Sequence, residues 1–304
     1  MKRIDFACKT ITPMFLAGEN GETPELRPPS IKGLMRFWWR AVQRFEDPSA
    51  LRDREAEIFG SAYRKSERAG FRIRIKKSQL DDTGSAQPLP HHREGWCDPK
   101  KGCVFRNNRC TKTKPLPCFQ SGGFFTLEFV CRDGIDHDLV AKTFELSAIL
   151  GGLGKRSRRG FGSFFIEEDE ENQQKELARK ICGLMNSACM IEEPCIFSEK
   201  QIPGSNISHI YSSGSATTTE YPQIKKILIK QTSEPPRNIL IKIGEASHAW
   251  PGPDCGNGNP RLASPVYITL YTYYGNRFVI ITHLASNKNE IYQQNFIDEV
   301  LSNV

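Results

Sequence analysis

The first half of the chain alternates short apolar runs with two longer stretches of helical periodicity. Alternating apolar and polar residues predict strands, and apolar residues three or four positions apart predict amphipathic helices. The strands are expected at residues 4–11, 71–75, 124–130 and 161–166, and the helices at residues 30–45 and 136–150. The resulting order, strand-helix-strand-strand-helix-strand, is that of a ferredoxin-like fold.

A long segment, residues 78–122, interrupts this order. It is rich in Pro, Gly, Asn and Cys and has no clear periodicity, so we expect an insertion between the second and third strands. The acidic run Glu167–Glu171 then marks a boundary. Because acidic residues favour a helix N-terminus, this run is expected to open a helix that continues to about Met190.

The second half contains fewer clear signals. We expect a strand at residues 239–243, a hairpin of Val266–Tyr274 with Arg277–Leu284, and a C-terminal amphipathic helix that carries Phe296. The composition of Gly275-Asn276 fits a two-residue hairpin turn. The chain is therefore predicted to be an α+β protein of two ferredoxin-like (βαββαβ) domains, residues 1–166 and 167–304, the second of them degraded.

Charge is distributed unevenly along the chain. The net charge is +7 overall, but residues 1–165 carry +11 and residues 166–304 carry −4. A basic first half favours a polyanion as partner, most often nucleic acid, although a generic basic surface would give the same count. The ten cysteines, the lack of a signal-peptide pattern and the lack of an apolar run of membrane length predict a cytoplasmic protein with reduced thiols.

The helix expected at residues 30–45 separates apolar from basic residues. Ile31, Leu34 and Trp38 fall on one face, and a row of cations falls on the opposite face. Like charges at i,i+4 destabilise a helix by a few tenths of a kcal/mol per pair. This row therefore indicates that an acidic residue from elsewhere in the chain, or a bound polyanion, offsets the repulsion. Ser30 is the expected N-cap, and free amides beside Lys32 would favour a phosphate.

Two aromatic residues, Phe37 and Trp39, flank the faces of this helix. Either could stack on a base, although packing at the edge of the core is the commoner role for such residues. The residues expected to contact RNA from this region are Arg27, Lys32, Arg36, Trp39, Arg40 and Arg44.

A second basic motif lies in the glycine-rich segment 151–162, which has five glycines around four cations. Glycines let a backbone approach a ligand closely, and clustered cations repel one another unless phosphates lie between them. A Walker loop is excluded because Arg156 follows Gly154-Lys155 where Ser or Thr is required. The residues expected to contact RNA here are Lys155, Arg156, Arg158 and Arg159, and an exposed basic turn without a ligand is the alternative.

Four segments together resemble the RAMP superfamily of CRISPR proteins. They are the first strand, the R-P-P-S-I-K-G-x-x-R-F-W-W-R helix, E-x-x-I-F-G-S at residues 55–61 and the glycine-rich segment. Within that superfamily the chain is most similar to the family of subunit one of type III-B Cmr effector complexes, and residues 261–266 are similar to its second domain. The insertion 78–122 has no counterpart.

The resemblance implies two ferredoxin-like domains and a role in guide-directed RNA targeting. It implies binding of guide or target single-stranded RNA, contact with other subunits of a Cmr effector complex and no catalysis, while the lack of an apolar run of membrane length predicts no membrane association. An endoribonuclease of the same superfamily that processes CRISPR RNA is the alternative, and it would need a general base near the glycine-rich segment. A scaffold that binds only protein would leave the basic helix face unexplained.

The insertion contains the other candidate chemistry. Cys97, Cys103, Cys110 and Cys118, with His91 and His92 nearby, form a candidate structural zinc site, although no pair has the C-x2-C spacing. Free thiols are the alternative, and no other cofactor is expected. The pair His137-Asp138 resembles half of a metal phosphohydrolase motif, but Asp136 or Asp138 at a helix start is simply expected to cap it.

Overall fold

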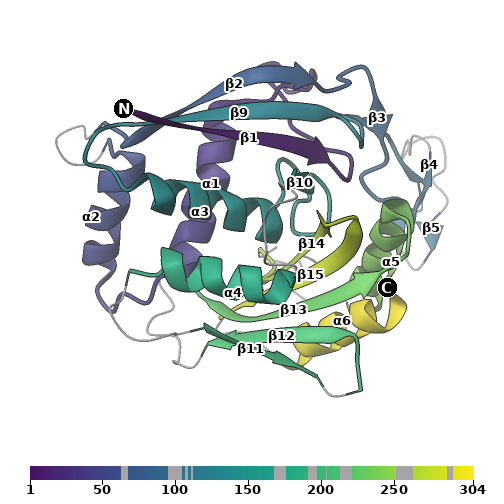
Figure 1. Cartoon of the computed structure of the whole chain (residues 1–304). Coiled ribbons are helices and arrows are strands. Elements are labelled where there is room, and N and C mark those ends of the chain that lie inside the picture. Colours follow the sequence, from purple (N-terminus) through teal and green to yellow (C-terminus); the bar gives the residue numbers. More distant parts are fainter. Residues whose placement is uncertain are drawn as a thin grey trace.

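The computed structural model shows an α+β protein built on two larger antiparallel sheets (Figure 1). It describes the chain except residues 63–67, 95–104, 107–108, 111, 168–175, 191–196, 203, 213–220, 251–262 and 286–289. No described helix is long and apolar enough to span a membrane.

The first sheet has four strands in the order β10-β1-β9-β2, all paired antiparallel. The strands are β1 (Lys2–Thr10), β2 (Phe71–Gln79), β9 (Phe124–Cys131) and β10 (Phe164–Ile166). Helices α1 (Pro28–Val42) and α3 (His137–Leu150) lie together on one face of this sheet (Figure 1). Alternation along the strands buries Phe6 and Phe129 under α3, where the ring of Phe144 lies 4.7 and 4.9 Å from theirs.

The starts of these two helices differ from each other. Asp136 caps α3, as expected, and accepts from the amides of Asp138 and Leu139 at 2.9 and 3.1 Å. The expected cap of α1, Ser30, is wrong: α1 begins at Pro28 after Arg27. Proline is favoured in the first helical turn because its ring fixes φ and that turn needs no amide donor.

Helix α2 (Pro48–Phe59) was not expected from the sequence. Asp47-Pro48 ends the preceding helical pattern and also starts the next helix, because Asp47 accepts from the amide of Ser49 at 2.8 Å. Gly60, with φ of 81°, ends α2. This helix lies beside α1 (Figure 1) and contributes to the candidate site below.

Among its described residues, the insertion contains short strand pairs. They are β3 (Ser85–Ala86) with β8 (Leu116–Pro117), β4 (Arg93–Glu94) with β7 (Lys112–Thr113), and β5 (Phe105–Arg106) with β6 (Arg109–Cys110). The expected insertion between β2 and β9 is thus present.

The second half forms a five-stranded antiparallel sheet in the order β11-β12-β13-β15-β14. Its elements are α4 (Leu177–Ala188), β11 (Phe197–Gln201), β12 (Ile207–Ser212), β13 (Ile224–Thr232), α5 (Pro236–Ala249), β14 (Val266–Tyr273), β15 (Asn276–Leu284) and α6 (Glu290–Asn303). The C-terminal helix buries Phe296, as expected, and packs beside α5 (Figure 1).

Two expectations for this half need correction. Residues 239–243 are helical rather than extended, because Ile239, Leu240 and Ile243 point to one side of α5 and are buried there. The hairpin of β14 and β15 is confirmed, but its turn residues are Tyr274 and Gly275, with φ of 45° and 75°. Both positive values are those of a type I′ turn.

The two halves share one continuous core. One buried cluster includes α1, α3, α4 and strands of both sheets. Thr269 of β14 donates its hydroxyl to the carbonyl oxygen of Ile149 at 2.9 Å, and the amide of Leu270 donates to Ser163 Oγ at 3.2 Å. The glycine-rich segment therefore lies at the junction of the two halves.

Candidate nucleic-acid interface

The basic row of α1 faces helix α2. Arg40 donates to both carboxylate oxygens of Glu55, with Nη2 2.6 Å from Oε1. Arg36 pairs with the same carboxylate through Nε at 2.8 Å, and its Nη2 donates to the carbonyl oxygen of Gly60 at 2.5 Å. The acid that the sequence pattern required is therefore Glu55, whose side chain is 8% exposed.

One carboxylate does not neutralise this row. Lys32 donates to the carbonyl oxygen of Phe59 at 3.3 Å, and its ammonium lies 5.0 Å from the ring centroid of Phe71. Burial, and then the charge of Arg36, lowers the pKa of Lys32. Arg36 and Arg40 keep 35% and 38% of their side chains exposed. Three cations and one acid leave a partly exposed surface with a net positive charge.

The start of α1 offers fewer donors than expected. Pro28 and Pro29 have no amide hydrogen, and the amide of Ser30 donates to the carbonyl oxygen of Arg27 at 3.0 Å. The expectation that free amides beside Lys32 favour a phosphate is therefore wrong. Arg27 itself is half-buried.

Two residues expected in the interface lie inside the protein. Trp39 is fully buried, with its ring 6.0 Å from that of Phe59. Arg44 is 5% exposed, and its Nη2 donates to the carbonyl oxygen of Ile224 in β13 at 2.6 Å. Burial lowers the pKa of Arg44. The expectation that Arg44 continues an outward basic face is wrong, because α1 ends at Val42 and the chain turns toward the second sheet.

The glycines of the segment 151–162 are required by packing within the chain. A Cβ at Gly162, where φ is 69°, would lie 1.9 Å from the carbonyl oxygen of Leu153. A Cβ at Gly154, where φ is 91°, would lie 2.3 Å from the carbonyl oxygen of Phe15. Hence the glycine density reflects close approach of the chain to itself, and it is no longer evidence for a ligand.

The four cations of this segment have different surroundings. Arg159 donates to the carbonyl oxygen of Val266 at 3.1 Å and lies 4.8 Å from the ring centroid of Phe296, so it joins the two halves. Arg158 lies 4.8 Å from the ring centroid of Tyr267. Arg156 is half-buried with a positive φ of 63°, and Lys155 is exposed.

Helix α1 meets the glycine-rich segment through apolar residues rather than through its basic row. A Cβ at Gly151 would lie 2.3 Å from Trp38 Nε1. The ring of Tyr267 lies 5.2 Å from that of Phe37, and Arg158 lies over the face of the Tyr267 ring. The cations Lys32, Arg36 and Arg40 thus contact α2, while Arg158 contacts Tyr267, which packs against Phe37 of α1.

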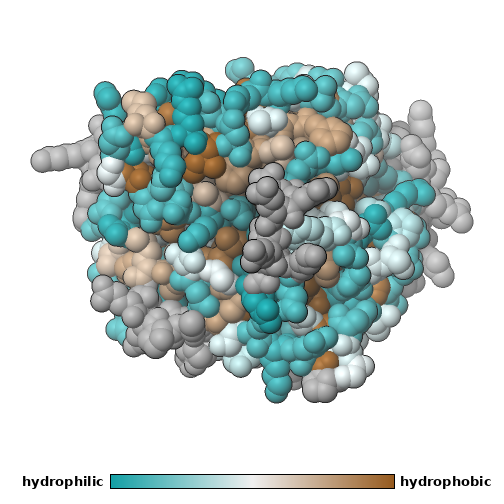
Figure 2. Space-filling view, viewed as in Figure 1, coloured by the Kyte–Doolittle hydropathy of each residue, from teal (hydrophilic) through white to brown (hydrophobic). Residues whose placement is uncertain are grey.

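Sequence reasoning missed a further basic surface on the open face of the first sheet. Phe71 and Ile73 of β2 are buried, while Arg72 and Arg74 between them are exposed. Arg74 lies 3.4 Å from Glu128, which partly neutralises this face. Figure 2 shows mainly hydrophilic residues along the top of the molecule, where Figure 1 places β2 and β9. The F-R-I-R-I alternation was the signal that could have identified it.

The cysteine cluster cannot be assembled from the described residues. Cys97 and Cys103 lie outside them, and for Cys110 only the backbone, in β6, is described. Cys118 is a buried free thiol, and burial raises its pKa to about 11. The zinc site of the four cysteines therefore stays a prediction.

Comparison with known proteins places these features in a family. A family model described as the RAMP superfamily matches residues 7–164. The CRISPR system Cmr subunit Cmr1-2 of Pyrococcus furiosus is 28% identical over 183 residues, which are 53% of this chain and 94% of that protein. Subunit Cmr1-1 of the same organism is 30% identical over 151 residues, which are 48% of this chain and 41% of that protein.

Two solved structures share the fold over nearly the whole chain. The crystal structure of Cmr1 from Pyrococcus furiosus in its apo form has a TM-score of 0.51 at 17% identity, over 100% of this chain and 97% of that one. A chain in the cryo-EM structure of the type III-B Cmr-beta complex bound to cognate target RNA has a TM-score of 0.56 at 13% identity, over 98% of both chains.

Proposed function

The chain belongs to the RAMP superfamily, and from that premise we propose that it is a non-catalytic RNA-binding subunit of a cytoplasmic type III-B CRISPR effector complex. The curated relatives are named as Cmr subunits, and one structural neighbour lies in a complex bound to target RNA. The proposed ligand is the backbone of guide or target single-stranded RNA, and the proposed protein partners are the other subunits of the complex.

The observation that carries this proposal is the excess of positive charge on α1. Lys32, Arg36 and Arg40 form one row, and Glu55 is the carboxylate that pairs with it. A phosphate could supply the missing negative charge, since Arg36 and Arg40 stay partly exposed. Cations in these surroundings recognise phosphates rather than base edges, so we expect little sequence preference.

We assign both halves to the ferredoxin-like arrangement, with residues 1–166 and 167–304 as the two domains. The strand order β10-β1-β9-β2 supports this for the first half, because it is the antiparallel order 4-1-3-2 of that fold. In the second half, β13, β14 and β15 take the places of strands one to three. There β12, which precedes them in sequence, occupies the place of the fourth strand, and this supports a degraded domain.

The test is titration of labelled single-stranded RNA with a triple variant, Arg40→Ala, Lys155→Ala and Arg158→Ala. Arg40→Ala leaves Glu55 paired with Arg36, so the variant should stay folded. Each lost phosphate contact should reduce the slope of log affinity against log salt by about 0.7. We expect a decrease of about 2 for the triple variant and none for the control Lys200→Ala with Arg237→Ala, two exposed cations of the second half.

A binding curve of the triple variant that matches the wild type at every salt concentration would refute this interface. The basic surfaces would then serve a neighbouring protein subunit. A scrambled RNA that binds ten times more weakly than the original would instead refute recognition through the backbone.

The endoribonuclease remains the second candidate because one histidine lies near the glycine-rich segment. The charge of Arg156 acts on His91, whose Nε2 atom lies 3.2 Å from that of His248. Incubation of labelled RNA with the protein distinguishes the two functions. We expect no cleavage, whereas cleavage that disappears in His91→Ala would establish the nuclease.

A further inference from the structure

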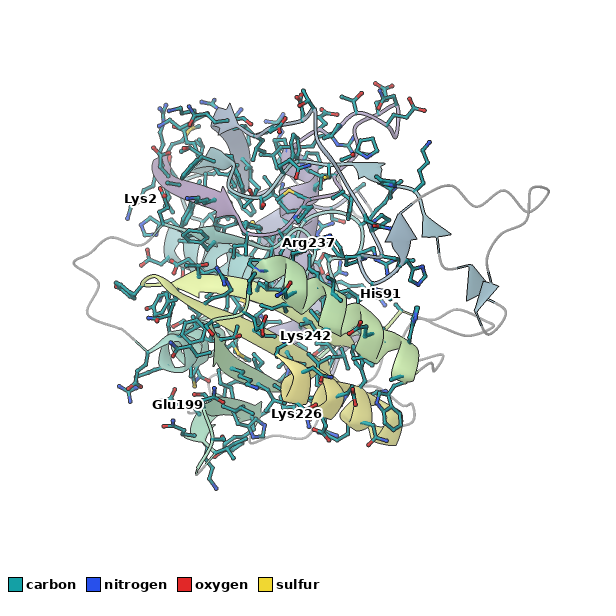
Figure 3. All side chains as sticks on the ribbon, turned by 90° about the vertical axis from the view of Figure 1, so that its right-hand side faces the viewer. Lys2, His91, Glu199, Lys226, Arg237 and Lys242 are labelled. Atoms are coloured by element: carbon teal, nitrogen blue, oxygen red, sulfur yellow. The ribbon has the colours of Figure 1, made fainter. Side chains whose placement is uncertain are left out.

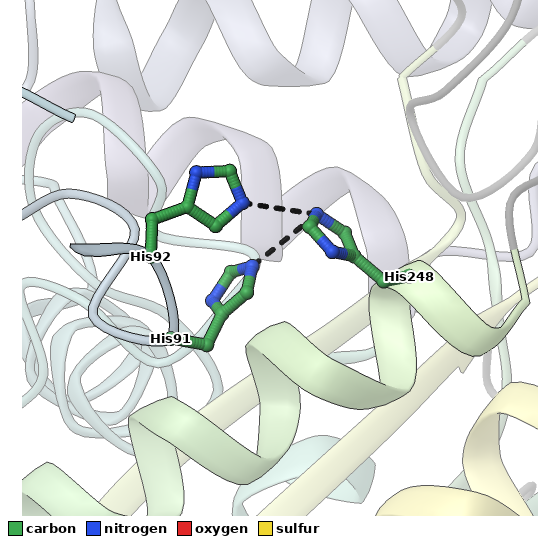
Figure 4. A group of neighbouring side chains, drawn as sticks. All are labelled: His91, His92 and His248. Carbon is green, nitrogen blue, oxygen red and sulfur yellow. Dashed lines mark hydrogen bonds between the residues drawn. The ribbon is translucent and has the colours of Figure 1, made fainter. Parts of the chain in front are cut away.

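Three histidines from distant parts of the chain converge on one point. His91 and His92 lie in the insertion, just before β4, and His248 lies in the last turn of α5 (Figure 4). The Nε2 atom of His248 is 3.2 Å from that of His91 and 3.4 Å from that of His92. Figure 3 shows His91 beside α5 on the side of the molecule that carries the insertion.

These separations match the edges of a tetrahedral metal site. Zinc binds imidazole nitrogen at about 2.0–2.1 Å, so two nitrogens of one tetrahedral ion lie about 3.3–3.4 Å apart. We propose that His91, His92 and His248 bind one divalent transition-metal ion, with zinc the best fit. The three candidate ligand atoms all lie within 4.8 Å of one another.

Hydrogen bonding alone explains this convergence poorly. A neutral imidazole Nε2 carries either one hydrogen or one lone pair, so it forms one direct N–H···N bond. Two other Nε2 atoms approach that of His248, whereas an ion between them would use all three lone pairs at once.

Helix α5 leaves space for the ring of His91 at Gly244 and contributes the side chain of His248. A Cβ at Gly244 would lie 2.0 Å from His91 Nδ1 and 2.5 Å from its Cε1. Glycine inside a helix costs about 1 kcal/mol relative to alanine, so a structural reason for Gly244 is expected. Gly244 and His248 are four residues apart and share a helix face, which places the ring of His91 next to His248.

The ligand set indicates the class of metal and its role. Imidazole nitrogens suit zinc, copper and nickel, whereas magnesium and calcium prefer oxygen ligands. Three histidines leave a fourth coordination position, which water can occupy. The ion would tie the insertion to α5 and thereby connect the two halves of the chain.

The test uses the full-length chain after chelation and dialysis against zinc. We expect about one zinc per chain by elemental analysis, a higher melting temperature with zinc than with EDTA, and the visible absorption of tetrahedral cobalt after exchange. His248→Ala should weaken binding at least tenfold. The matched control His209→Ala removes a half-buried histidine of β12 and should leave binding unchanged.

Gly244→Ala is the second variant, since it keeps every ligand. Alanine favours the helix but occupies the space of the His91 ring, so zinc affinity should again fall at least tenfold. The proposal is overturned if the wild type binds no zinc or cobalt. It is equally overturned if zinc stays bound in both His248→Ala and Gly244→Ala but is lost when Cys97, Cys103 and Cys110 are changed to serine.

Discussion

Arg40 holds Glu55 through both carboxylate oxygens, and Arg36 pairs with the same group from one turn earlier in α1. Glu55 thus connects α2 to the basic row of α1 and sets how much of that row's charge remains for a ligand. Because its side chain is almost buried, removing either the acid or its partners changes both stability and charge.

The first prediction concerns Glu55→Gln. The amide keeps the shape of the side chain but removes the negative charge that competes with a phosphate. RNA should bind more tightly, and the salt slope should increase by about 0.7. At the same time the fold should lose roughly 1–3 kcal/mol of stability, because two arginines lose their charged partner.

Tighter RNA binding together with lower stability would show that the basic row of α1 binds RNA, whereas lower stability alone would show that Glu55 is only structural. A fluorescence titration measures the affinity, and urea unfolding measures the stability. The control Glu57→Gln alters an exposed acid of α2 that pairs with Arg54, so it should change stability little. Weaker RNA binding by folded Glu55→Gln would show that the row of α1 does not bind phosphate.

The second prediction is a pH dependence that comes from Lys32. Burial lowers its pKa in the folded state below the ordinary lysine value of 10.5, so the unfolded state binds the proton more strongly. The protonated side chain therefore costs stability at neutral pH, and this cost disappears as the pH rises toward 10.5. Lys32→Met should be relatively more stable than the wild type at pH 7, and the difference should shrink at pH 10.

Urea unfolding of both proteins at the two pH values measures this difference. Comparing variants cancels the titration of other groups, such as the cysteines. If the difference between wild type and Lys32→Met is the same at both pH values, burial does not affect Lys32. The same variant should bind RNA more weakly if Lys32 contacts phosphate.

The third prediction separates a structural from a ligand-binding role of the glycines. Gly162→Ala should destabilise the fold by at least about 2 kcal/mol, because its φ is positive and its Cβ would meet the carbonyl oxygen of Leu153. Gly33→Ala in α1 is the matched control. A Cβ at Gly33 would meet no atom within 4 Å. Because alanine has a better helix propensity than glycine, this variant should gain up to about 1 kcal/mol of stability. Thermal unfolding measures both, and a stable Gly162→Ala protein that fails only in RNA binding would contradict the packing argument.

Local patterns predicted the first sheet better than the helices around it. The alternation in β1, β2 and β9 is strong because one face of the sheet is covered and the other is open. No helix was expected between residues 45 and 71, so α2 and the pairing of Glu55 were missed, although Asp47 and Pro48 are typical of a helix start. In α5, residues 239–243 were expected to form a strand, but burial of Ile239, Leu240 and Ile243 on one side fits a helix.

Long-range contacts were not predictable from the sequence. The helical wheel correctly grouped Lys32, Arg36 and Arg40, but only the position of α2 reveals that the two arginines meet a carboxylate. The motif 151–162 was identified, yet the reason for its glycines is the approach of Phe15 and Leu153. Likewise, His91 and His248 are separated by 157 positions, and no local pattern indicates that they meet.

The last prediction is that Arg44 stabilises the junction of the two halves rather than binding RNA. Arg44→Ala removes donors to the carbonyl oxygens of Gln43 and Ile224, at 2.9 and 2.6 Å, and leaves a cavity beside Phe197. Such losses cost about 2–5 kcal/mol, which urea unfolding measures. The control Arg72→Ala, an exposed residue of β2, should stay within about 0.5 kcal/mol of wild type. Because Arg44 is buried, the folded fraction of Arg44→Ala should bind RNA with wild-type affinity. If this variant instead keeps its stability and loses RNA binding, Arg44 contacts RNA and does not stabilise the junction.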